Sequence, residues 1–154
     1  MTIKLDKEVE NIKTEEVQIN EAEEYIETSK EMIQYCLDKG ALGLAAPQIG
    51  INKRFFVFAR KPKEYQVIFN PSYFRDGTPT NTVEGCLSYP DKNYFLKKKR
   101  YKRIRVVYYT YKDGKLLRIK QSLSGEPSII FQHETDHLKG ITINMIGEEI
   151  EQNK

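Results

Sequence analysis

The spacing of apolar side chains predicts a long helix near the start of the chain, over residues 20–39. Asn20 and Glu23 form a pair typical of a capping box at its start. Gly40 stands where a glycine ends many helices. The residues expected on the buried stripe are Ala22, Tyr25, Ile26, Ile33, Cys36 and Leu37. Cys36 lies on this stripe, so we interpret it as a core residue rather than a reactive thiol.

The middle of the chain has the pattern of antiparallel strands. Short apolar and β-branched runs predict strands at 54–59 and 65–69, the second closed by Asn70-Pro71. Two further strands, 101–111 and 115–123, flank Asp113-Gly114, a strong hairpin signal. Residues 82–90 are expected to form a loop or an edge strand.

Two further segments complete the predicted elements. Residues 40–50 are rich in Gly and Ala, which favours a loop where the backbone approaches another group closely over an ordinary strand. A final helix is expected over 127–139, with Pro127 in its first turn and Gly140 after its end. The order helix, strands, helix is that of an α+β domain. We expect mostly antiparallel strands around the C-terminal helix, with the N-terminal helix packed on the outside.

Composition adds modest constraints. The 154 residues are 39% hydrophobic and 31% charged, which is typical of one globular domain spanning 1–154. A net charge of +3 does not by itself indicate nucleic-acid binding. No apolar stretch has the length of a membrane span or of a signal peptide, and two cysteines are no disulfide framework. We therefore expect a cytoplasmic protein without a membrane or a specific nucleic-acid partner.

The segment His133-Glu134-Thr135-Asp136-His137 is the clearest chemical signal, and it contains the only two histidines of the chain. Residues four apart share one face of a helix, so both imidazoles can bind one metal ion. Glu134 then lies beside that ion, where it can act as general base on metal-bound water. The alternative to a metal site is a purely structural role, in which these polar side chains form hydrogen bonds on a helix face.

A catalytic metal site of this type needs a third protein ligand. Cys86, in Glu84-Gly85-Cys86-Leu87-Ser88, offers a thiolate suited to zinc or ferrous iron. Chemistry alone leaves two readings open: Cys86 is either that ligand or a small buried apolar residue.

Three motifs in order resemble the signatures of peptide deformylases: Gly43-Leu-Ala-Ala-Pro-Gln48, Glu84-Gly-Cys-Leu-Ser88 and Gln132-His-Glu-Thr-Asp-His-Leu-Lys-Gly140. The resemblance implies a hydrolase that removes the N-formyl group from formyl-methionyl nascent polypeptides. The cofactor it implies is one divalent metal ion, ferrous iron first, with zinc, nickel or cobalt as substitutes. Proximity to the ribosome is part of the same expectation.

The resemblance also implies residue roles. The metal ligands would be Cys86, His133 and His137, and Glu134 would be the general base and acid. Gln48 and the backbone N–H of Leu87 would donate hydrogen bonds to the formyl oxygen, where loss of one such donor costs about 10²–10³ in rate. Without the resemblance, Gln48 would be taken for a loop amide that caps local backbone. The substrate-binding residues would be Gly43 through its main chain, Ile129 and Ile130 in the methionine pocket, and Arg100 near the peptide-binding groove.

Departures from the family pattern concern the substrate pocket. Ala41 replaces the first glycine of the Gly-x-Gly loop, and Glu126 replaces an apolar residue seven positions before His133. Glu126 therefore bears on the far wall of the pocket and on its tolerance for longer or charged side chains. Asp136 and Glu84 are candidates for groups that hold the ligands in place; for Asp136 the alternative is a solvated helix face.

The basic run 97–105 has two competing interpretations. It is either the solvated face of an edge strand, where lysine opposes aggregation, or a contact for an anionic partner such as ribosomal RNA. Two other functions also stay open at this stage. A zincin-like endopeptidase would not need Cys86, and a non-catalytic metal module would need a fourth ligand.

Overall fold

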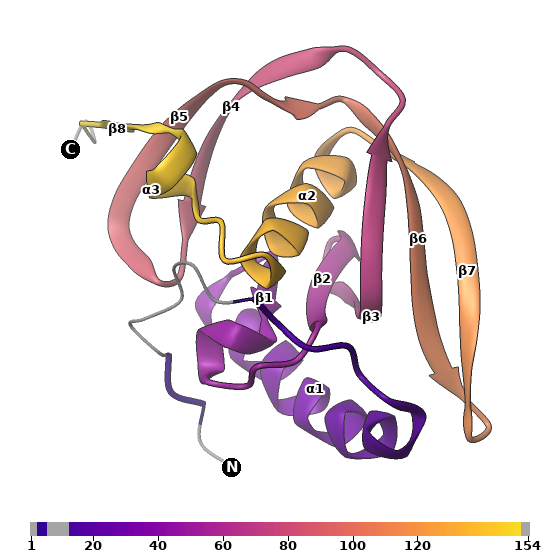
Figure 1. Cartoon of the computed structure of the whole chain (residues 1–154). Helices are drawn as coiled ribbons and strands as arrows, with labels where there is room; N and C mark the ends of the chain where they lie inside the picture. Colours follow the sequence, from indigo (N-terminus) through magenta and orange to yellow (C-terminus); the bar gives the residue numbers. More distant parts are fainter. Residues whose placement is uncertain (1–2, 6–12, 152–154) are drawn as a thin grey trace.

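A computed structural model describes residues 3–5 and 13–151 (Figure 1). Within these residues, the structure has two helices longer than one turn and eight strands, with a short 3-10 helix after β1. In chain order the elements are α1 (Ile19–Lys39), β1 (Gly43–Ala45), η1 (Ala46–Ile49), β2 (Phe55–Lys61), β3 (Glu64–Arg75), β4 (Pro79–Cys86), β5 (Tyr89–Tyr101), β6 (Arg103–Lys112), β7 (Lys115–Ser124), α2 (Glu126–Leu138), α3 (Ile143–Ile146) and β8 (Glu148–Ile150).

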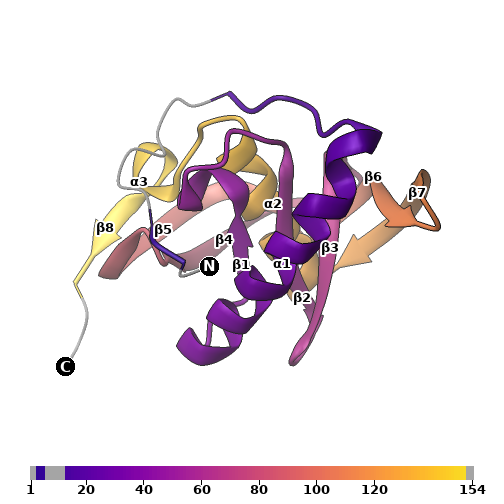
Figure 2. The ribbon, with the colours of Figure 1, turned by 90° about the horizontal axis from the view of Figure 1, so that it is seen from below.

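Two antiparallel sheets surround α2. The larger sheet has the strand order β1-β2-β3-β6-β7, and the smaller has the order β4-β5-β8. Figure 1 shows α2 between the large sheet and the arch of β4 and β5. Figure 2, from below, shows α1 crossing the outer side of β1, β2 and β3. The predicted α+β architecture, with a central C-terminal helix and an outer N-terminal helix, is confirmed.

Strand β2 explains why α1 and α2 pack on opposite faces of the sheet. Its side chains alternate between the faces, as in any strand. Phe56 and Phe58 contact the Phe131 ring of α2, with ring centroids 5.2 and 5.6 Å apart. Phe55 and Val57 belong to the second core cluster, which lies under α1. Because both faces are covered, β2 is apolar without alternation over Phe55–Ala59.

The N-terminal helix differs from the prediction in its cap and in part of its stripe. It begins one residue earlier than expected, and the Glu21 carboxylate accepts a hydrogen bond of 2.9 Å from the Gln18 N–H. The predicted capping pair Asn20–Glu23 is therefore wrong. Gln18 and Glu21, which have the same spacing two residues earlier, form the pair instead. Leu37 is 40% exposed, whereas Met32, absent from the predicted stripe, is fully buried. Gly40 ends the helix in the left-handed conformation as expected, with φ of 69°.

The strands run further than the sequence indicated. Gly43–Ala45 form a strand paired with β2, so the prediction of a loop throughout 40–50 is wrong there. Strand β3 continues past Asn70-Pro71 to Arg75, with a register shift between Phe69 and Ser72. Such an irregularity takes a proline, which has no N–H, out of the hydrogen-bond ladder.

Strand β5 was not predicted from the sequence. It covers thirteen residues, and the predicted strand at 101–111 begins instead at Arg103. Residues 82–90, expected to be a loop or an edge strand, form the end of the edge strand β4 and the start of β5, with a turn at 87–88 between them. The exposed residues Lys97–Lys99 hide the alternation of β5, whereas the Asp113-Gly114 hairpin turn is confirmed, with φ values of 52° and 75°.

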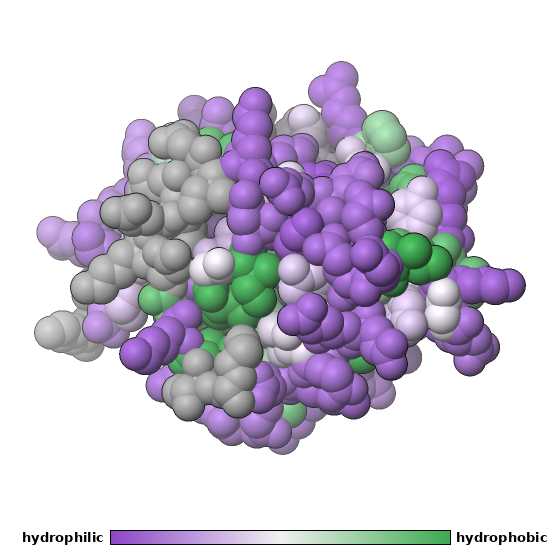
Figure 3. Space-filling model, turned by 60° about the horizontal axis from the view of Figure 1, so that its bottom comes forward, coloured by the Kyte–Doolittle hydropathy of each residue, from purple (hydrophilic) through white to green (hydrophobic). Residues whose placement is uncertain are grey.

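The face of the molecule shown in Figure 3 is largely hydrophilic, with a few apolar residues between the polar ones. Within the described residues, the helices are too short or too polar to cross a bilayer.

Candidate active site

Three potential metal ligands converge between β4 and α2. His133 and His137 lie one turn apart on α2, with their Nε2 atoms 3.3 Å apart. Cys86, at the end of β4, places its Sγ 3.4 Å from His137 Nε2. All three ligand atoms lie within 4.8 Å of one another. Ligands bound about 2.0–2.3 Å from a tetrahedral metal lie roughly 3.3–3.6 Å apart, so this donor set fits one divalent ion. The tertiary structure thereby favours Cys86 as a ligand over the alternative of a buried apolar residue.

Glu84 orients one of these ligands. Its Oε1 lies 2.8 Å from His133 Nδ1, which leaves Nε2 directed toward Cys86 and His137. Carboxylates commonly fix ligand imidazoles in this way. Burial alone would raise the pKa of Glu84, but the hydrogen bonds from His133 and Arg100 outweigh burial and lower that pKa to about 2. Glu84 is therefore an ionised hydrogen-bond acceptor at the back of the site.

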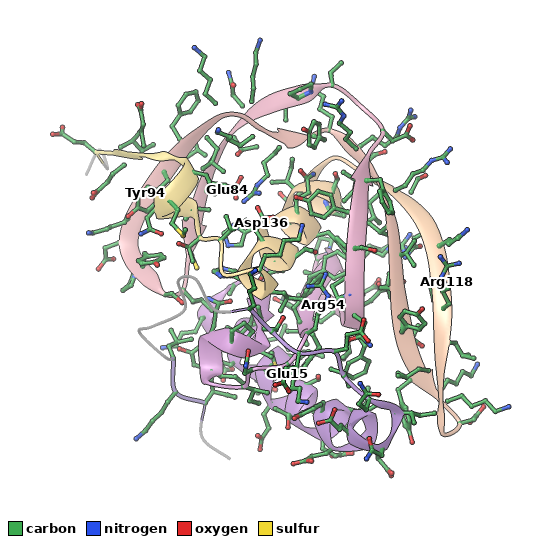
Figure 4. The ribbon with its side chains drawn as sticks, in the orientation of Figure 1. Glu15, Arg54, Glu84, Tyr94, Arg118 and Asp136 are labelled. Atoms are coloured by element: carbon green, nitrogen blue, oxygen red, sulfur yellow. The ribbon has the colours of Figure 1, made fainter. Side chains whose placement is uncertain are left out.

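Arg100 connects Glu84 to Asp136. Its guanidinium forms ion pairs of 3.0 Å with Glu84 and 2.5 Å with Asp136, and its side chain is 2% exposed. Asp136 also accepts a hydrogen bond from the Tyr73 hydroxyl. The interpretation of Asp136 as a residue on a solvated helix face is wrong, because its side chain is buried in this network. Figure 4 shows Glu84 and Asp136 facing each other across the space between β4 and α2.

The prediction for Arg100 needs correction. It was expected near the peptide-binding groove, but it is fully buried and does not line the cleft beside the metal ligands. The physical reason is its position on β5, a strand that the sequence did not predict. Lys97–Lys99 point to solvent before it, and Arg100 points inward to two carboxylates.

Glu134 lies on α2 between the two histidines and is 4% exposed. Burial raises the pKa of its carboxyl group to about 7, against the opposing effect of His133 and Arg100. Its Oε1 has no hydrogen-bond partner among the described residues. Its Oε2 lies so close to Gly43 that a Cβ added there would be 2.5 Å away. The expected close approach of the Gly/Ala-rich segment is thus to Glu134.

Gln48 also lies at this site, on η1. Its Oε1 accepts a hydrogen bond of 2.9 Å from the Ala45 N–H, so it does cap local backbone. Its Nε2 donates to Ser88 Oγ at 2.9 Å and to Cys86 Sγ at 3.4 Å. The Gln48 amide is therefore held by Ala45 and Ser88, with its Nε2 also beside the Cys86 thiol. Ser88, which the sequence analysis did not single out, is the partner that completes this arrangement.

A cleft of about 470 Å³ opens beside these groups. Its lining brings together nearly all predicted substrate-binding and catalytic residues, together with exposed apolar side chains of Leu42 and Val83 at its rim. The predicted residues that line it are Gly43, Gln48, Cys86, Leu87, Ile129, Ile130, His133 and Glu134, and Glu126 stands at its edge.

The family model described as Polypeptide deformylase matches residues 2–152. The chain belongs to the peptide deformylase family. The enzyme is 38% identical over 117 residues to the peptide deformylase of Thermotoga neapolitana, covering 75% of this chain and 68% of that relative.

Solved deformylases share the fold of this chain. The crystal structure of the Thermotoga maritima peptide deformylase superposes with a TM-score of 0.82 at 28% identity, covering 95% of this chain and 97% of the other. A Met-Ala-Ser-bound class I type b deformylase from Acinetobacter baumannii superposes with a TM-score of 0.78 at 25% identity, covering 95% and 98%. The Cys86–His133–His137 group matches the deformylase metal site, so this chain is a metal-dependent hydrolase with peptide deformylase activity.

Proposed function

We propose that this deformylase acts on formyl-methionyl peptides with Cys86, His133 and His137 holding one ferrous ion. The convergence of a thiol and two imidazoles on one point carries the proposal. Thiolate and imidazole ligands suit ferrous iron, and they accept zinc, nickel or cobalt as substitutes. A divalent metal bound there would act as a Lewis acid toward the formyl oxygen and would lower the pKa of its bound water toward neutrality.

Glu134 is the proton carrier in this proposal. Its buried carboxyl group, with a pKa of about 7, suits a group that gains and loses a proton near neutrality. It accepts the proton of the attacking water and then donates it to the departing amine of methionine. Because Gly43 has no Cβ, the Glu134 carboxylate can lie close against β1.

Gln48 and the Leu87 main chain stabilise the charge that develops on the formyl oxygen. The Gln48 Nε2 already lies 3.4 Å from Cys86 Sγ, on the side where the formyl group would lie. The Leu87 N–H follows directly after Cys86, so it is held in place with the ligand. Donors fixed before the reaction need no reorganisation as the charge forms.

The open edge of β1 is proposed as the binding site of the peptide main chain. β1 is the terminal strand of its sheet. The Ala59 N–H donates to the Leu42 carbonyl at 2.8 Å, and Gly43 is paired with Phe58. In an antiparallel ladder, hydrogen-bonded pairs alternate with pairs that are not hydrogen-bonded. Because Leu42 is bonded to Ala59, the next pair, Gly43 with Phe58, is not, and the Gly43 N–H and C=O point away from β2. They can therefore add an extended peptide to the sheet, beside the metal ligands.

The methionine side chain is proposed to lie against Ile129 and Ile130, one turn before His133 on α2. Glu126 stands a further turn away at the edge of the same cleft and is exposed. We also propose that residues 1–154 act as one catalytic domain, in the cytoplasm and near the ribosome, because nascent polypeptides are the family's substrates.

The test is release of formate from formyl-Met-Ala-Ser by protein reconstituted anaerobically with Fe(II). Wild-type protein should turn over, whereas Glu134→Gln should keep its metal and lose about 10²–10⁴ in kcat. Cleavage of internal peptide bonds without formate release would instead support an endopeptidase. A fully active Glu134→Gln variant would refute the role of Glu134.

Cobalt substitution tests the third ligand separately. Co(II) protein should show a sulfur-to-cobalt charge-transfer band, and Cys86→Ala should abolish it. Cys36→Ala is the matched control, since it removes the other thiol without touching the site. A band that persists in Cys86→Ala would exclude Cys86 as a ligand.

A further inference from the structure

A second cavity, of about 390 Å³, lies on the large sheet away from the metal ligands. Its lining residues include Phe74 of β3, Arg105 and Val107 of β6, and Arg118 and Lys120 of β7, together with the uncharged Val106, Gln121 and Ser122. We call the first five of these residues and the space between them the back groove. Ile104 and Val106, the neighbours of Arg105 in β6, belong to the core that contacts α2. Since successive residues of a strand face opposite sides, the back groove lies on the face opposite α2.

The back groove is rich in positive charge. Arg105, Arg118 and Lys120 are all exposed. Lys120 is paired with Val107, so it is a diagonal neighbour of Arg105 and lies two residues from Arg118 along β7. Figure 4 labels Arg118 on β7, on the outer side of the sheet.

Only a small part of this charge is neutralised. Asp76 lies 3.6 Å from Arg105, but it also pairs with Arg103 at 3.2 Å. Arg118 and Lys120 have no ion pair within the described parts of the chain. The groove therefore keeps a net positive charge that an anionic ligand would neutralise.

An exposed aromatic ring lies among these cations. Phe74 is 60% exposed and is paired across the strands with Arg105. Lysine and arginine on an edge strand such as β7 also oppose edge-to-edge aggregation. That role does not account for Arg105 on β6, which is an inner strand, nor for an exposed phenylalanine, which favours aggregation.

We propose that the back groove binds single-stranded RNA without sequence preference. Arg105, Arg118 and Lys120 would contact phosphates, and Phe74 would stack on a base. A positively charged groove with an aromatic platform is the arrangement that single-stranded nucleic acids require. The choice of RNA over DNA rests on the proposed function, in which the substrates are nascent polypeptides that emerge from an RNA-containing particle. The site is separate from the deformylase cleft and adds a binding function to it.

The experiment measures anisotropy of a fluorescent single-stranded RNA of about 12 nucleotides, within the usual site sizes, over about 50–200 mM salt. Three phosphate contacts predict that the logarithm of the binding constant falls with a slope of about −2 against the logarithm of the salt concentration. The double variant Arg118→Gln/Lys120→Gln removes two of these contacts, so its slope should be shallower by about 1.4. Phe74→Ala should weaken binding about 5- to 100-fold. All variants should release formate from formyl-Met-Ala-Ser at the wild-type rate, because the groove lies on the other face of the sheet.

Matched controls come from the same hairpin. Lys112→Gln/Lys115→Gln removes two exposed charges at its tip, and Leu117→Ala removes an exposed apolar side chain. Both should bind RNA as the wild type does. If Lys112→Gln/Lys115→Gln makes the salt dependence of binding as much shallower as Arg118→Gln/Lys120→Gln does, RNA binds diffusely to the charged surface and the proposal fails. Tighter binding of polyglutamate than of RNA, with no effect of Phe74→Ala, would assign the groove to an acidic protein and also overturn it.

Discussion

Removing the charge of Arg100 should destabilise the protein more than any surface change on the same strand. Arg100→Met keeps most of the apolar stem but leaves Glu84 and Asp136 buried without their cation. The side chains of these three residues are 2%, 8% and 10% exposed, so water cannot replace the lost partner. Breaking a buried ion pair by removing one partner costs about 3–5 kcal/mol. For a protein of this length that corresponds to a fall of roughly 6–20 °C in Tm.

Urea unfolding of metal-free protein is the assay, because bound metal would add its own stabilisation. Lys99→Met is the matched control: it makes the same chemical change at the adjacent, exposed position and should alter the unfolding free energy by less than about 0.5 kcal/mol. Asp136→Asn added to Arg100→Met should recover part of the loss, since it removes one unpaired charge.

The pH dependence gives an independent check. In the wild type the pKa of Glu84 is lowered to about 2, so its stabilising contribution is present above pH ~4.5 and is lost as the pH falls toward 2. Without Arg100 the Glu84 carboxylate protonates at higher pH, so the cost of Arg100→Met should be smaller at pH ~5 than at pH ~8. If Arg100→Met costs no more than Lys99→Met at neutral pH, the network does not carry the stability assigned to it.

Three further predictions concern single residues. Gly43→Ala should reduce kcat about 10²-fold with metal content unchanged, since the added Cβ displaces Glu134; formate release and metal analysis decide this, and a wild-type kcat would contradict the close contact. Burial raises the pKa of Cys36 to about 12, so its stabilising contribution is present below pH ~9 and is lost as the pH rises. Relative to Cys36→Ala, the wild type should therefore lose about 1.4 kcal/mol of unfolding free energy between pH ~8 and ~10, and parallel curves would disprove the shift. Glu126→Leu should raise kcat/KM for formyl-Met-Ala-Ser about fourfold, the effect of one extra buried methylene group, and an unchanged value would remove Glu126 from the methionine pocket.

Local signals in the sequence were sufficient for the two long helices, for strands β2, β3, β6 and β7, and for two of the metal ligands. The 3.6-residue period marked α1, Pro127 and Gly140 marked the ends of α2, and the Asp113-Gly114 pair marked the hairpin. The spacing of His133 and His137 defined two ligands on one helix face. These features depend on residues close together in the chain, where geometry is fixed by the backbone itself. The family motifs extended this to Cys86, Glu134, Gln48 and Leu87 as candidates for one site.

The errors arose where long-range contacts decide the outcome. Gly43–Ala45 became a strand because β2 offers a partner, although glycine and alanine have little tendency to form strands. β5 is hidden in the sequence by its exposed lysines, and it exists because β4 and β8 pair with it. The sequence thus showed which residues carry charge or apolar character, but not which of them meet.

Arg100 illustrates this division between sequence and tertiary structure. Its neighbours 97–99 and 102–103 are exposed cations, and by sequence alone it belongs to the same basic run. The register of β5 turns it inward between Glu84 and Asp136, and Glu84 in turn holds His133. The sequence by itself determined the two histidine ligands and the helix that carries them, and it made Cys86 a candidate for the third. Only the tertiary structure decided the distance of Cys86 from the histidines, the partner of Arg100 and the position of the back groove, because each depends on strand pairing between residues far apart in the chain.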